Sequence, residues 1–369
     1  MANSFEPVRI GIVGCGNISG IYFENLTKFA GTQVVAAADL DLARAEAACA
    51  KYGVPNALSV DALLAHPEVE IVLNLTIPAA HAQVARAAVA AGKHVYNEKP
   101  LTILPEDAHT LLFEAAERGV RVGGAPDTFL GGAHQTARAA IARGDIGEPI
   151  GAHAFMLCHG HESWHPAPEF YYKPGGGPML DMGPYYLTDL VQLMGPIQRV
   201  AGSARITFPT RTITSQPKAG TVVEVETATH IAGIMDFRNG AIGEITTSFD
   251  VWHAVLPPIS IYGTEGSMLV PDPNGFGGEV KVRGKWQGEW SVVPNHHMFN
   301  GNDRGIGVLD MGVAIREGRP HRASGDLAAH VLSIMTSFGA SSDAGTHLGV
   351  AHLDAAPAPL GADELAPYV

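Results

Sequence analysis

Apolar runs of four to seven residues alternate with longer segments of helical periodicity over the first 127 residues. Short apolar runs bounded by turn residues are typical of buried strands, and apolar positions three or four residues apart indicate helices. The expected strands are 8–13, 33–38, 70–75, 94–97 and 120–123, and the expected helices are 18–29, 42–52, a short one capped by Ser59, 79–91 and 105–118. This alternation predicts a parallel sheet with helices on both faces.

Beyond residue 127 the pattern changes to one that is typical of an antiparallel sheet. Residues 151–293 favour Thr, Val, Ile and Phe, with Gly and Pro between the runs. The expected strands are 154–158, 201–208, 227–237, 241–249 and 259–262, and the expected helices are 133–142, 186–194 and 327–338. The end of the chain is rich in Ala and Pro, which predicts an extended or partly disordered arm.

The expected fold class is therefore α/β, with a doubly wound Rossmann-type sheet followed by an α/β domain with a mostly antiparallel sheet. The expected domains are 1–127 for a dinucleotide, 128–345 for substrate and oligomerisation, and 346–369 as a tail.

Composition restricts the class of partner. The net charge of −13 and the lack of any basic run argue against nucleic acid, and they favour a neutral over an acidic substrate. Three cysteines without close spacing predict neither a disulfide framework nor a zinc ribbon. No basic leader and no run of 18 apolar residues is present, so we expect a cytoplasmic protein that binds no membrane.

A glycine motif follows the first strand directly. Gly14 allows a tight turn, and Gly16 lets the backbone approach a pyrophosphate, whose charge the N-terminus of the next helix favours. Asn17 and Ile18 lie in the same turn, and Ser19 occupies the place of a usual third glycine. The alternative is a plain structural turn, but the order of strand, turn and helix favours a dinucleotide site.

Asp39 ends the second strand, 25 residues after Gly14 (39 − 14 = 25). A carboxylate there can accept hydrogen bonds from the adenosine ribose and repels a 2′-phosphate, while Leu40 supplies no cation. The sequence therefore predicts NAD over NADP. The alternative is that Asp39 only caps the helix that begins at Leu42.

A charged pair, Glu98-Lys99, follows the strand 94–97 and precedes Pro100. The carboxyl ends of parallel strands meet at the ligand crevice, where a lysine can reach a substrate hydroxyl. Desolvation and a positive nicotinamide favour the neutral amine, which suits proton transfer. The alternative is a surface salt bridge between Glu98 and Lys99.

With these motifs the chain resembles the Gfo/Idh/MocA oxidoreductases. The resemblance rests on the glycine turn, on Thr76-Ile77-Pro78 with His81, on Gly92-Lys93-His94 running into Glu98-Lys99-Pro100, and on Gly175-Gly176-Gly177 followed by Leu180-Asp181. It implies a Rossmann domain, a C-terminal open sheet that often forms a subunit interface, and hence a homodimer or homotetramer. It also implies that Lys99 is catalytic, that Lys99–Pro100 is commonly cis, and that Thr76, Pro78, His81 and Glu98 line the cofactor.

Tyr185 lies four residues after Asp181, where inositol-dehydrogenase-like members carry histidine. Tyrosine resembles the glucose-fructose oxidoreductase and dihydrodiol dehydrogenase branch, in which it is the proposed proton relay. Residues four apart on a helix share a face, so both side chains can point at a substrate. The alternative for Tyr185 is a packing role.

A histidine-rich loop, 158–166, precedes the triple glycine. Its histidines, with His161 and His165 among them, can bind sugar hydroxyls while Trp164 stacks on a ring; structural histidines or a metal site are the alternatives, and we expect no metal. Asp127, just after the last Rossmann strand, is a further substrate candidate.

The function expected is NAD-dependent oxidation of a hydroxyl of a sugar, glycoside or polyol. The alternatives within the resemblance are an NAD-dependent glycoside hydrolase and a non-catalytic NAD(P)-binding regulator. The retained Lys99, Asp181 and Tyr185 favour an enzyme.

Overall fold

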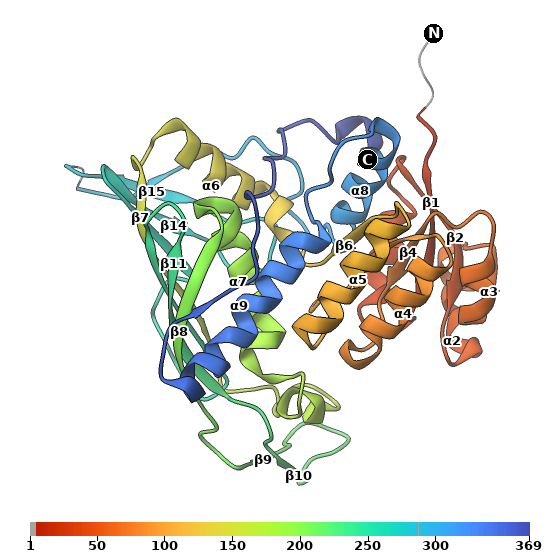
Figure 1. Cartoon of the computed structure of the whole chain (residues 1–369), viewed down its shortest axis with the longest axis horizontal. Helices are drawn as coiled ribbons and strands as arrows, with labels where there is room; N and C mark the ends of the chain where they lie inside the picture. Colours follow the sequence, from red (N-terminus) through yellow and green to blue (C-terminus); the bar gives the residue numbers. More distant parts are fainter. Residues whose placement is uncertain (1–4, 287) are drawn as a thin grey trace. The chain divides into compact units, whose positions relative to one another are not determined.

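The computed structural model describes residues 5–286 and 288–369, and these residues separate into two units (Figure 1). The first unit combines the chain up to residue 131 with 297–329 and 357–369, and the second combines 132–296 with 330–356. This division differs from the expected linear domains, because the chain returns to the first unit twice after leaving it. Sequence order alone does not reveal such returns.

A six-stranded parallel sheet forms the first unit, in the order β3-β2-β1-β4-β5-β6. Its strands are β1 (Val8–Val13), β2 (Thr32–Ala38), β3 (Asn56–Leu58), β4 (Ile71–Asn74), β5 (His94–Asn97) and β6 (Val122–Gly124). Its helices are α1 (Ser19–Leu26), α2 (Leu42–Tyr52), α3 (Val60–Ala65), α4 (Pro78–Ala90), α5 (Pro105–Glu117) and the 3₁₀ turn η1 (Thr128–Leu130). The expected parallel sheet is confirmed.

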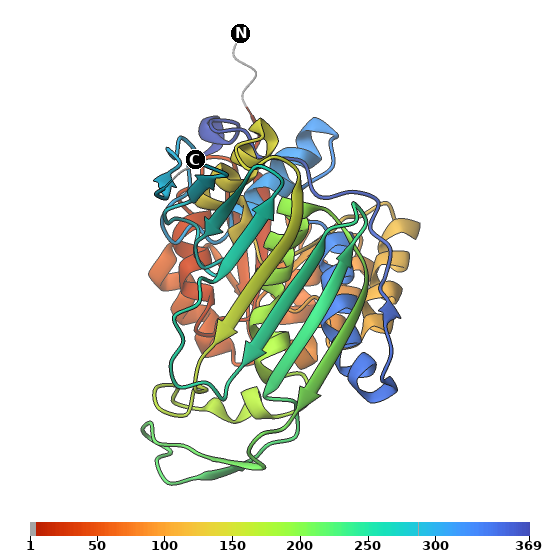
Figure 2. The same cartoon turned by 90° about the vertical axis from the view of Figure 1, so that its left-hand side faces the viewer.

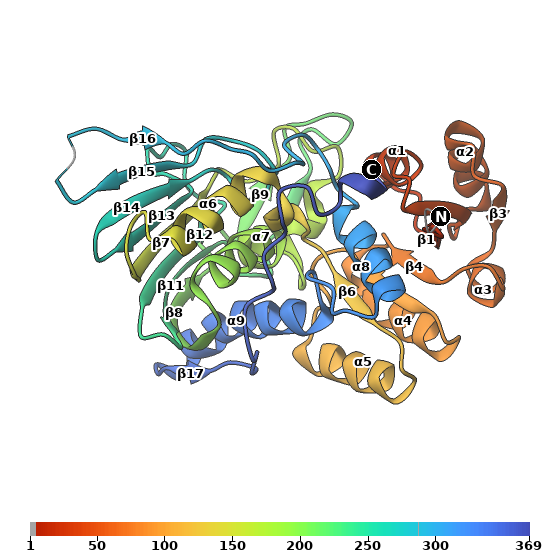
Figure 3. The same cartoon turned by 90° about the horizontal axis from the view of Figure 1, so that it is seen from above.

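The strands of this sheet are apolar because helices cover both faces, as the alternation predicts. Helices α1 and α2 lie on one face and α4 and α5 on the other (Figure 3). The rings of Phe23 and Tyr52 stack 4.9 Å apart and join α1 to α2. Ser59 caps α3 as expected, since its hydroxyl accepts a hydrogen bond from the N–H of Ala62.

Helix α8 (Ile306–Glu317) completes the first unit, although the sequence pattern predicts no helix there. A Cβ on Gly312 would lie 2.3 Å from Val8, so glycine is required where α8 crosses β1. Arg316 forms two hydrogen bonds of 2.8 Å to Glu70, which also pairs with Arg9. The two glycines that obscure the helical pattern both allow close contacts: Gly312 with Val8, and Gly307 with Tyr96, whose hydroxyl would lie 2.1 Å from a Cβ.

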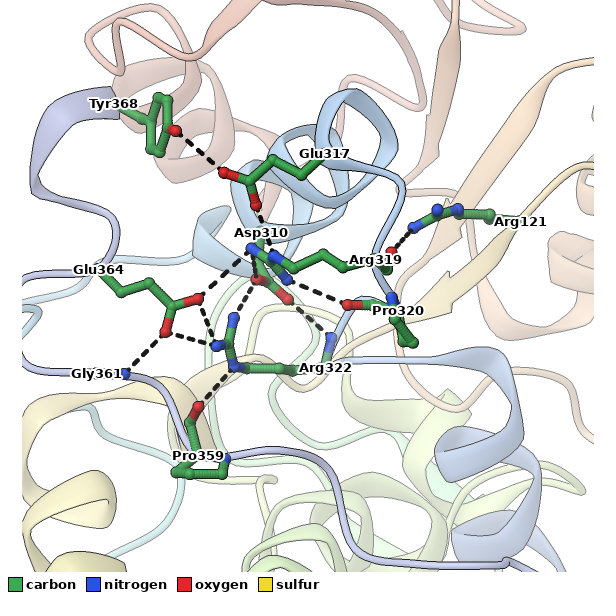
Figure 4. A network of polar contacts seen from close by, with 10 residues as sticks. All are labelled: Arg121, Asp310, Glu317, Arg319, Pro320, Arg322, Pro359, Gly361, Glu364 and Tyr368. Carbon is green, nitrogen blue, oxygen red and sulfur yellow. Dashed lines mark hydrogen bonds and ion pairs between the residues drawn. The ribbon is translucent and has the colours of Figure 1, made fainter.

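The segment 357–369 also packs into the first unit, and the expectation of an extended or disordered arm is wrong for it. Leu360 and Leu365 are buried. Arg322 donates to both carboxylate oxygens of Glu364 at 2.6 Å and to Asp310 at 2.5 Å (Figure 4). The segment is rich in Ala and Pro, so its composition does not reveal the few Leu and acidic residues that anchor it.

A nine-stranded sheet forms the second unit, in the order β16-β15-β14-β13-β7-β12-β11-β8-β17. Every neighbouring pair is antiparallel except β7 with β12, so the expected mostly antiparallel sheet is confirmed. Its strands are β7 (Pro149–Leu157), β8 (Ile197–Arg205), β11 (His230–Phe237), β12 (Ile242–Ser248), β13 (Ile259–Gly263), β14 (Gly266–Val270), β15 (Lys281–Gly284), β16 (Ser291–Val292) and β17 (Leu348–Gly349).

Three helices pack on one face of this sheet: α6 (Gly132–Arg143), α7 (Gly177–Met194) and α9 (Gly325–Ala344), which passes from the first unit into the second at residue 330. In the described part of the chain no helix covers the opposite face, which is turned to the viewer in Figure 2. Strands β9 (Thr210–Thr212) and β10 (Val222–Glu224) form a separate two-stranded ribbon, and the 3₁₀ helices η2 (Pro168–Tyr172) and η3 (Ala366–Tyr368) complete the elements.

Helix α7 is longer than the pattern predicts. The sequence predicts a helix only from Tyr186, because Pro184 lacks an N–H and usually ends a helix. The helix begins at Gly177 and continues through Pro184. Neighbouring elements bury most of its length and hold it in place, so Asp181 and Tyr185 both lie on it. None of the helices in the described ranges is long and apolar enough to cross a membrane.

Candidate active site

The glycine turn after β1 has the shape that a dinucleotide requires. Gly14 has φ +101°, and a Cβ there would lie 2.7 Å from the backbone of Leu75, so only glycine fits. A Cβ on Gly16 would have no atom within 4 Å, so the space beside this residue is open for a phosphate to approach the backbone. Asn17 and Ile18 are exposed at the N-terminus of α1, where the helix dipole favours an anion.

The carboxylate of Asp39 organises the turn from the end of β2. Its Oδ2 accepts a hydrogen bond from the N–H of Cys15 at 2.8 Å, and its Oδ1 accepts one from Asp41 at 2.9 Å. Helix α2 is capped instead by Asp41, whose side chain accepts from the N–H of Ala43. The alternative that Asp39 is the helix cap is therefore wrong.

Two buried asparagines fix the ends of the central strands. Asn74, at the end of β4, donates to Oδ1 of Asn97 at the end of β5. Asn97 donates in turn to the carbonyl of Leu101, and Oδ1 of Asn74 accepts from the hydroxyl of Thr76 at 2.7 Å. This network sets the course of the chain on both sides of Lys99. The peptide bond between Lys99 and Pro100 is cis, as the family resemblance implies.

Glu98 is buried, so its carboxylate does not lie on the surface. One carboxylate oxygen of Glu98 accepts from the hydroxyl of Tyr22 at 2.8 Å, and the other accepts from the backbone N–H of Lys99 at 2.8 Å. Burial, and then the charge of Glu98, raise the pKa of Tyr22 well above its usual range, so its hydroxyl remains a donor. The two hydrogen bonds of Glu98, to Tyr22 and to the N–H of Lys99, therefore orient the backbone at Lys99.

His81 connects the Thr76-Ile77-Pro78 motif to the Lys99-Pro100 motif. Its imidazole is fully buried in α4, with Nδ1 2.7 Å from the carbonyl oxygen of Pro100 and Nε2 3.1 Å from that of Thr76. Burial lowers the pKa of His81, so the ring is neutral and carries one N–H, which the shorter distance assigns to Pro100. Pro78 is the first residue of the same helix. The geometry gives His81 a positioning contact to the Lys99-Pro100 motif.

Asp127 is buried beside the start of α8. Its Oδ2 accepts hydrogen bonds from the N–H groups of Gly305 at 2.8 Å and Gly307 at 3.0 Å. Burial raises the pKa of Asp127 to about 6, and the two backbone donors only partly offset this effect. These contacts give the carboxylate a structural role of its own, and its substrate role stays a prediction.

Asp181 and Tyr185 lie one turn apart on α7 in the second unit. Asp181 is largely buried, and its Oδ2 lies 3.4 Å from Nε2 of His161. Tyr185 is buried, with 7% of its surface exposed. The structure therefore brings together three of the residues that the sequence analysis assigns to chemistry or substrate binding.

The histidine-rich loop forms an aromatic cluster beside Asp181. The ring of His161 lies 4.2 Å from that of Tyr171 and 5.2 Å from that of Trp164, which is 61% exposed. His165 packs 5.4 Å from both Trp164 and Tyr171, and burial lowers its pKa. The exposed indole and the neutral imidazole of His165 suit a neutral, hydroxyl-rich ligand.

A buried ion pair supports this loop from behind. Glu162 accepts from Arg211 at 3.0 Å and from the hydroxyl of Tyr172 at 2.5 Å, and the guanidinium also pairs with Asp250. The backbone carbonyl of Glu162 accepts from two further N–H groups, those of Thr214 and Ser215. These contacts therefore anchor the loop at Glu162, which lies between His161 and His165.

Sequence reasoning missed the supporting residues around the site: Tyr22, Asn74, Asn97, Tyr171, Tyr172 and Arg211. Asn74 and Asn97 carried a signal, since a polar residue ends each of two otherwise apolar strands. Tyr22 and Arg211 lie far along the chain from the motifs that they support, and Tyr171 and Tyr172 lie in a segment without a recognisable motif. Among residues 5–286 and 288–369, no three His, Cys, Asp or Glu side chains are grouped so as to hold a metal ion.

Comparison with known proteins agrees with both sheets. Residues 8–124 match the model of an oxidoreductase family with an NAD-binding Rossmann fold, and residues 134–269 match the C-terminal domain model of the same family. Fold and glycine turn thus define an oxidoreductase with an NAD(P)-binding Rossmann domain. The chain belongs to the Gfo/Idh/MocA family.

Similar proteins act on sugars and polyols. The chain is 29% identical over 267 residues to 1,5-anhydro-D-fructose reductase of Ensifer adhaerens, covering 71% of this chain and 75% of that one. It is 25% identical over 264 residues to myo-inositol 2-dehydrogenase of Thermotoga maritima, with the same two shares. A levoglucosan dehydrogenase solved with NADH and L-sorbose has the same fold, with a TM-score of 0.79 at 20% identity over 93% of this chain and 99% of that one.

Proposed function

We propose that this protein is an NAD-dependent dehydrogenase that oxidises a secondary hydroxyl of a sugar, glycoside or polyol. The observation that carries the proposal is the placement of Asp181 and Tyr185 on adjacent turns of α7, with His161 beside the carboxylate. The Rossmann unit supplies Lys99 at the carboxyl end of β5, the edge at which parallel sheets of this type bind ligands.

The roles follow from the chemistry of each side chain. Tyr185 takes the hydroxyl proton of the substrate while it passes its own phenolic proton to the neutral amine of Lys99. Asp181 accepts a hydrogen bond from a neighbouring hydroxyl and orients the ring, with His161 3.4 Å from the carboxylate. A bound nicotinamide would supply the acceptor for the hydride of the carbinol carbon. Orientation of the reacting groups supplies much of the rate, on the order of 7–11 kcal/mol for well-placed reactants.

The cofactor proposed is NAD, and Asp39 supports this choice. Its carboxylate is held beside the glycine turn by two backbone N–H groups, and the following Leu40 is fully exposed and uncharged. A 2′-phosphate would meet this negative charge without a cation to offset it. Thr76, Pro78 and Glu98 then line or position the nicotinamide end.

The substrate contacts proposed are His161, Trp164 and His165. The exposed indole of Trp164 offers a flat apolar surface for a sugar ring, and the imidazoles offer hydrogen bonds to hydroxyls. The net charge of −13 also favours a neutral substrate.

Among the described residues no helix covers one face of the nine-stranded sheet, and we propose that this face joins copies into a homodimer or homotetramer. Light scattering after size-exclusion chromatography tests this, and a monomer at micromolar concentration overturns it. The cytoplasm is the proposed compartment, which fits the three free thiols.

The function is tested by incubating the protein with NAD and a panel of aldoses, inositols and glycosides while following NADH absorbance. We expect NADH that depends on the sugar, with a loss of about 10²–10⁴-fold in kcat for Lys99→Ala and for Tyr185→Phe, because each removes a proton-transfer group. Lys93→Ala and Tyr186→Phe are matched controls. Lys93 lies at the opposite end of β5 and donates to the carbonyl of His66, and Tyr186 faces Asp272.

Three outcomes would contradict parts of the proposal. Release of a leaving group from a glycoside without net NADH indicates the hydrolytic alternative. Tight NAD binding without turnover of any substrate indicates the regulator. Equal losses in the control variants would mean that Lys99 and Tyr185 act only through stability.

Cofactor choice has its own test. We expect kcat/KM for NAD to exceed that for NADP, and Asp39→Ser combined with Leu40→Arg to reverse the preference. If the double variant leaves the ratio unchanged, Asp39 does not select the cofactor.

A further inference from the structure

A cavity of about 520 Å³ lies in the second unit beside the histidine-rich loop. Its volume falls within the roughly 300–1,000 Å³ of small-molecule sites. Residues 159, 160, 162 and 163 of the loop line it, whereas Nε2 of His161 lies 3.4 Å from Asp181. Phe208, the ribbon strand β9 and Trp252 complete the lining. Figure 1 shows β9 and β10 beyond one end of the nine-stranded sheet.

An aromatic platform forms one side of this cavity. The imidazole of His159 stacks on the indole of Trp252, with ring centroids 3.4 Å apart and planes at 13°. The ring of Phe208 meets His159 edge-on at 6.5 Å. Trp252 is 72% exposed and Phe208 is 44% exposed. Both rings therefore expose apolar surface to water, which is unfavourable in free energy.

Hydrogen-bonding groups line the same cavity. The exposed residues Thr210, Thr212 and Thr214 bring hydroxyls to it from alternate positions of one extended segment.

The charges around the cavity exclude an anion as its ligand. Arg211 is the guanidinium in the wall, and it is already paired with two carboxylates, those of Glu162 and Asp250. The local charge of this triad is negative, which repels phosphate or carboxylate. A flat apolar platform together with exposed threonine hydroxyls instead matches a neutral polyhydroxylated ring.

We infer that this cavity binds a second sugar ring, and therefore that the substrate is a glycoside or disaccharide and not a free monosaccharide. One ring lies at Asp181 and Tyr185, and the next ring passes the loop and stacks on Trp252. The step is short, because the Cα atoms of neighbouring residues lie about 3.8 Å apart, and His161 contacts Asp181 while Glu162 lines the cavity. This inference rests on the proposed function for its first ring only.

The test compares kcat/KM for D-glucose with kcat/KM for maltose, cellobiose and sucrose, with NAD present, in wild type and in Trp252→Ala. We expect at least one disaccharide to exceed glucose by about tenfold, which corresponds to about 1.4 kcal/mol of binding. Trp252→Ala removes that advantage and leaves glucose within twofold. Thr212→Val lowers the disaccharide value a few-fold, because it removes one hydroxyl without changing the shape. Trp286→Ala, at a 91% exposed indole outside the cavity, is the matched control and changes neither substrate.

Equal kinetics of wild type and Trp252→Ala on every disaccharide would overturn the inference and leave the proposed function intact. If no sugar is oxidised at all, saturation-transfer NMR of the same sugars with the NAD-bound protein separates the two ideas. Disaccharide binding that Trp252→Ala abolishes and Trp286→Ala keeps upholds the second-ring site while the proposed dehydrogenase fails. Absence of disaccharide binding overturns the second-ring site.

Discussion

Asp39 and Asp127 show how one residue type serves two purposes at equivalent positions. Each directly follows or lies just beyond a parallel strand, and each accepts two backbone hydrogen bonds. Asp39 is partly exposed beside the glycine turn, whereas Asp127 is buried against α8. The sequence predicts that both bind a ligand at the edge of the sheet, because the apolar strand before each one can be recognised. It does not reveal which carboxylate a later helix will cover.

The buried charge of Asp127 makes stability depend on pH. Its pKa in the folded protein is about 6, above the unfolded value of 3.8, so the folded state binds the proton more tightly. Its contribution is therefore most favourable below pH 3.8 and is lost as the pH rises through 6, by about 3 kcal/mol. We expect Asp127→Asn to gain stability relative to wild type between pH 4 and pH 7.

Urea unfolding of both proteins at these two pH values measures that difference. Asn keeps an oxygen that accepts from Gly305 and Gly307, so the fold is retained. A difference that does not change with pH would mean that Asp127 keeps an ordinary pKa.

Helix α7 carries the candidate catalytic pair, and its anchor to α6 is a buried ion pair. Nδ1 of His134 lies 2.9 Å from Asp189, and Nε2 lies 3.1 Å from the carbonyl oxygen of Gly275. Burial alone lowers the pKa of His134, but the carboxylate outweighs it and raises the pKa above the usual value. Gln192 donates to the other oxygen of Asp189 at 2.8 Å.

We expect His134→Leu to destabilise the protein by about 3–5 kcal/mol, because it leaves a buried carboxylate without its partner. The effect is largest below pH 6.5, where the pair contributes fully, and it diminishes as the pH rises through the raised pKa of His134. Thermal unfolding at pH 6 and pH 9 measures this. The double variant His134→Leu/Asp189→Leu is the control and should recover most of the loss; a double variant as unstable as the single one would show that packing, not charge, is responsible.

At the scale of elements, periodicity predicted the long apolar strands and the amphipathic helices of the Rossmann unit correctly. It missed β3 because three residues are too short to form a pattern. It missed α8 and the first half of α7 because Gly307, Gly312 and Pro184 oppose helix formation locally, and only tertiary contacts override them. The motif residues of the site were identifiable from sequence, but the buried partners that orient them were not, since those contacts join distant segments.

Across the whole molecule, the network around Arg322 joins α8 to the segment 357–369 (Figure 4). Asp310 is fully buried and binds both the backbone and the side chain of Arg322, and the guanidinium also reaches Glu364 and the carbonyl of Pro359. Tyr368 accepts a hydrogen bond from the N–H of Gly31 through its carbonyl, next to β2. The segment therefore stabilises the Rossmann unit.

We expect Arg322→Met to destabilise the first unit by about 1–3 kcal/mol, because Asp310 loses one of its two arginine partners and keeps Arg319. Limited proteolysis followed by mass spectrometry should detect faster cleavage within 357–369. Glu364→Gln is the milder comparison, since Glu364 is 36% exposed and Asp310 keeps its partner. Unchanged proteolysis of Arg322→Met would show that Leu360 and Leu365 hold the segment without the ion pairs.

The repeated return of the chain to its first unit bears on how the protein is made. A ribosome releases the six Rossmann strands early, but α8 and residues 357–369 emerge only after most of the second unit, on the order of ten seconds later at ~5–20 residues per second. During that interval the face of β1 that Gly312 will cover stays open. The dinucleotide unit therefore begins to form before the second unit and is completed only when α8 and residues 357–369 have joined it.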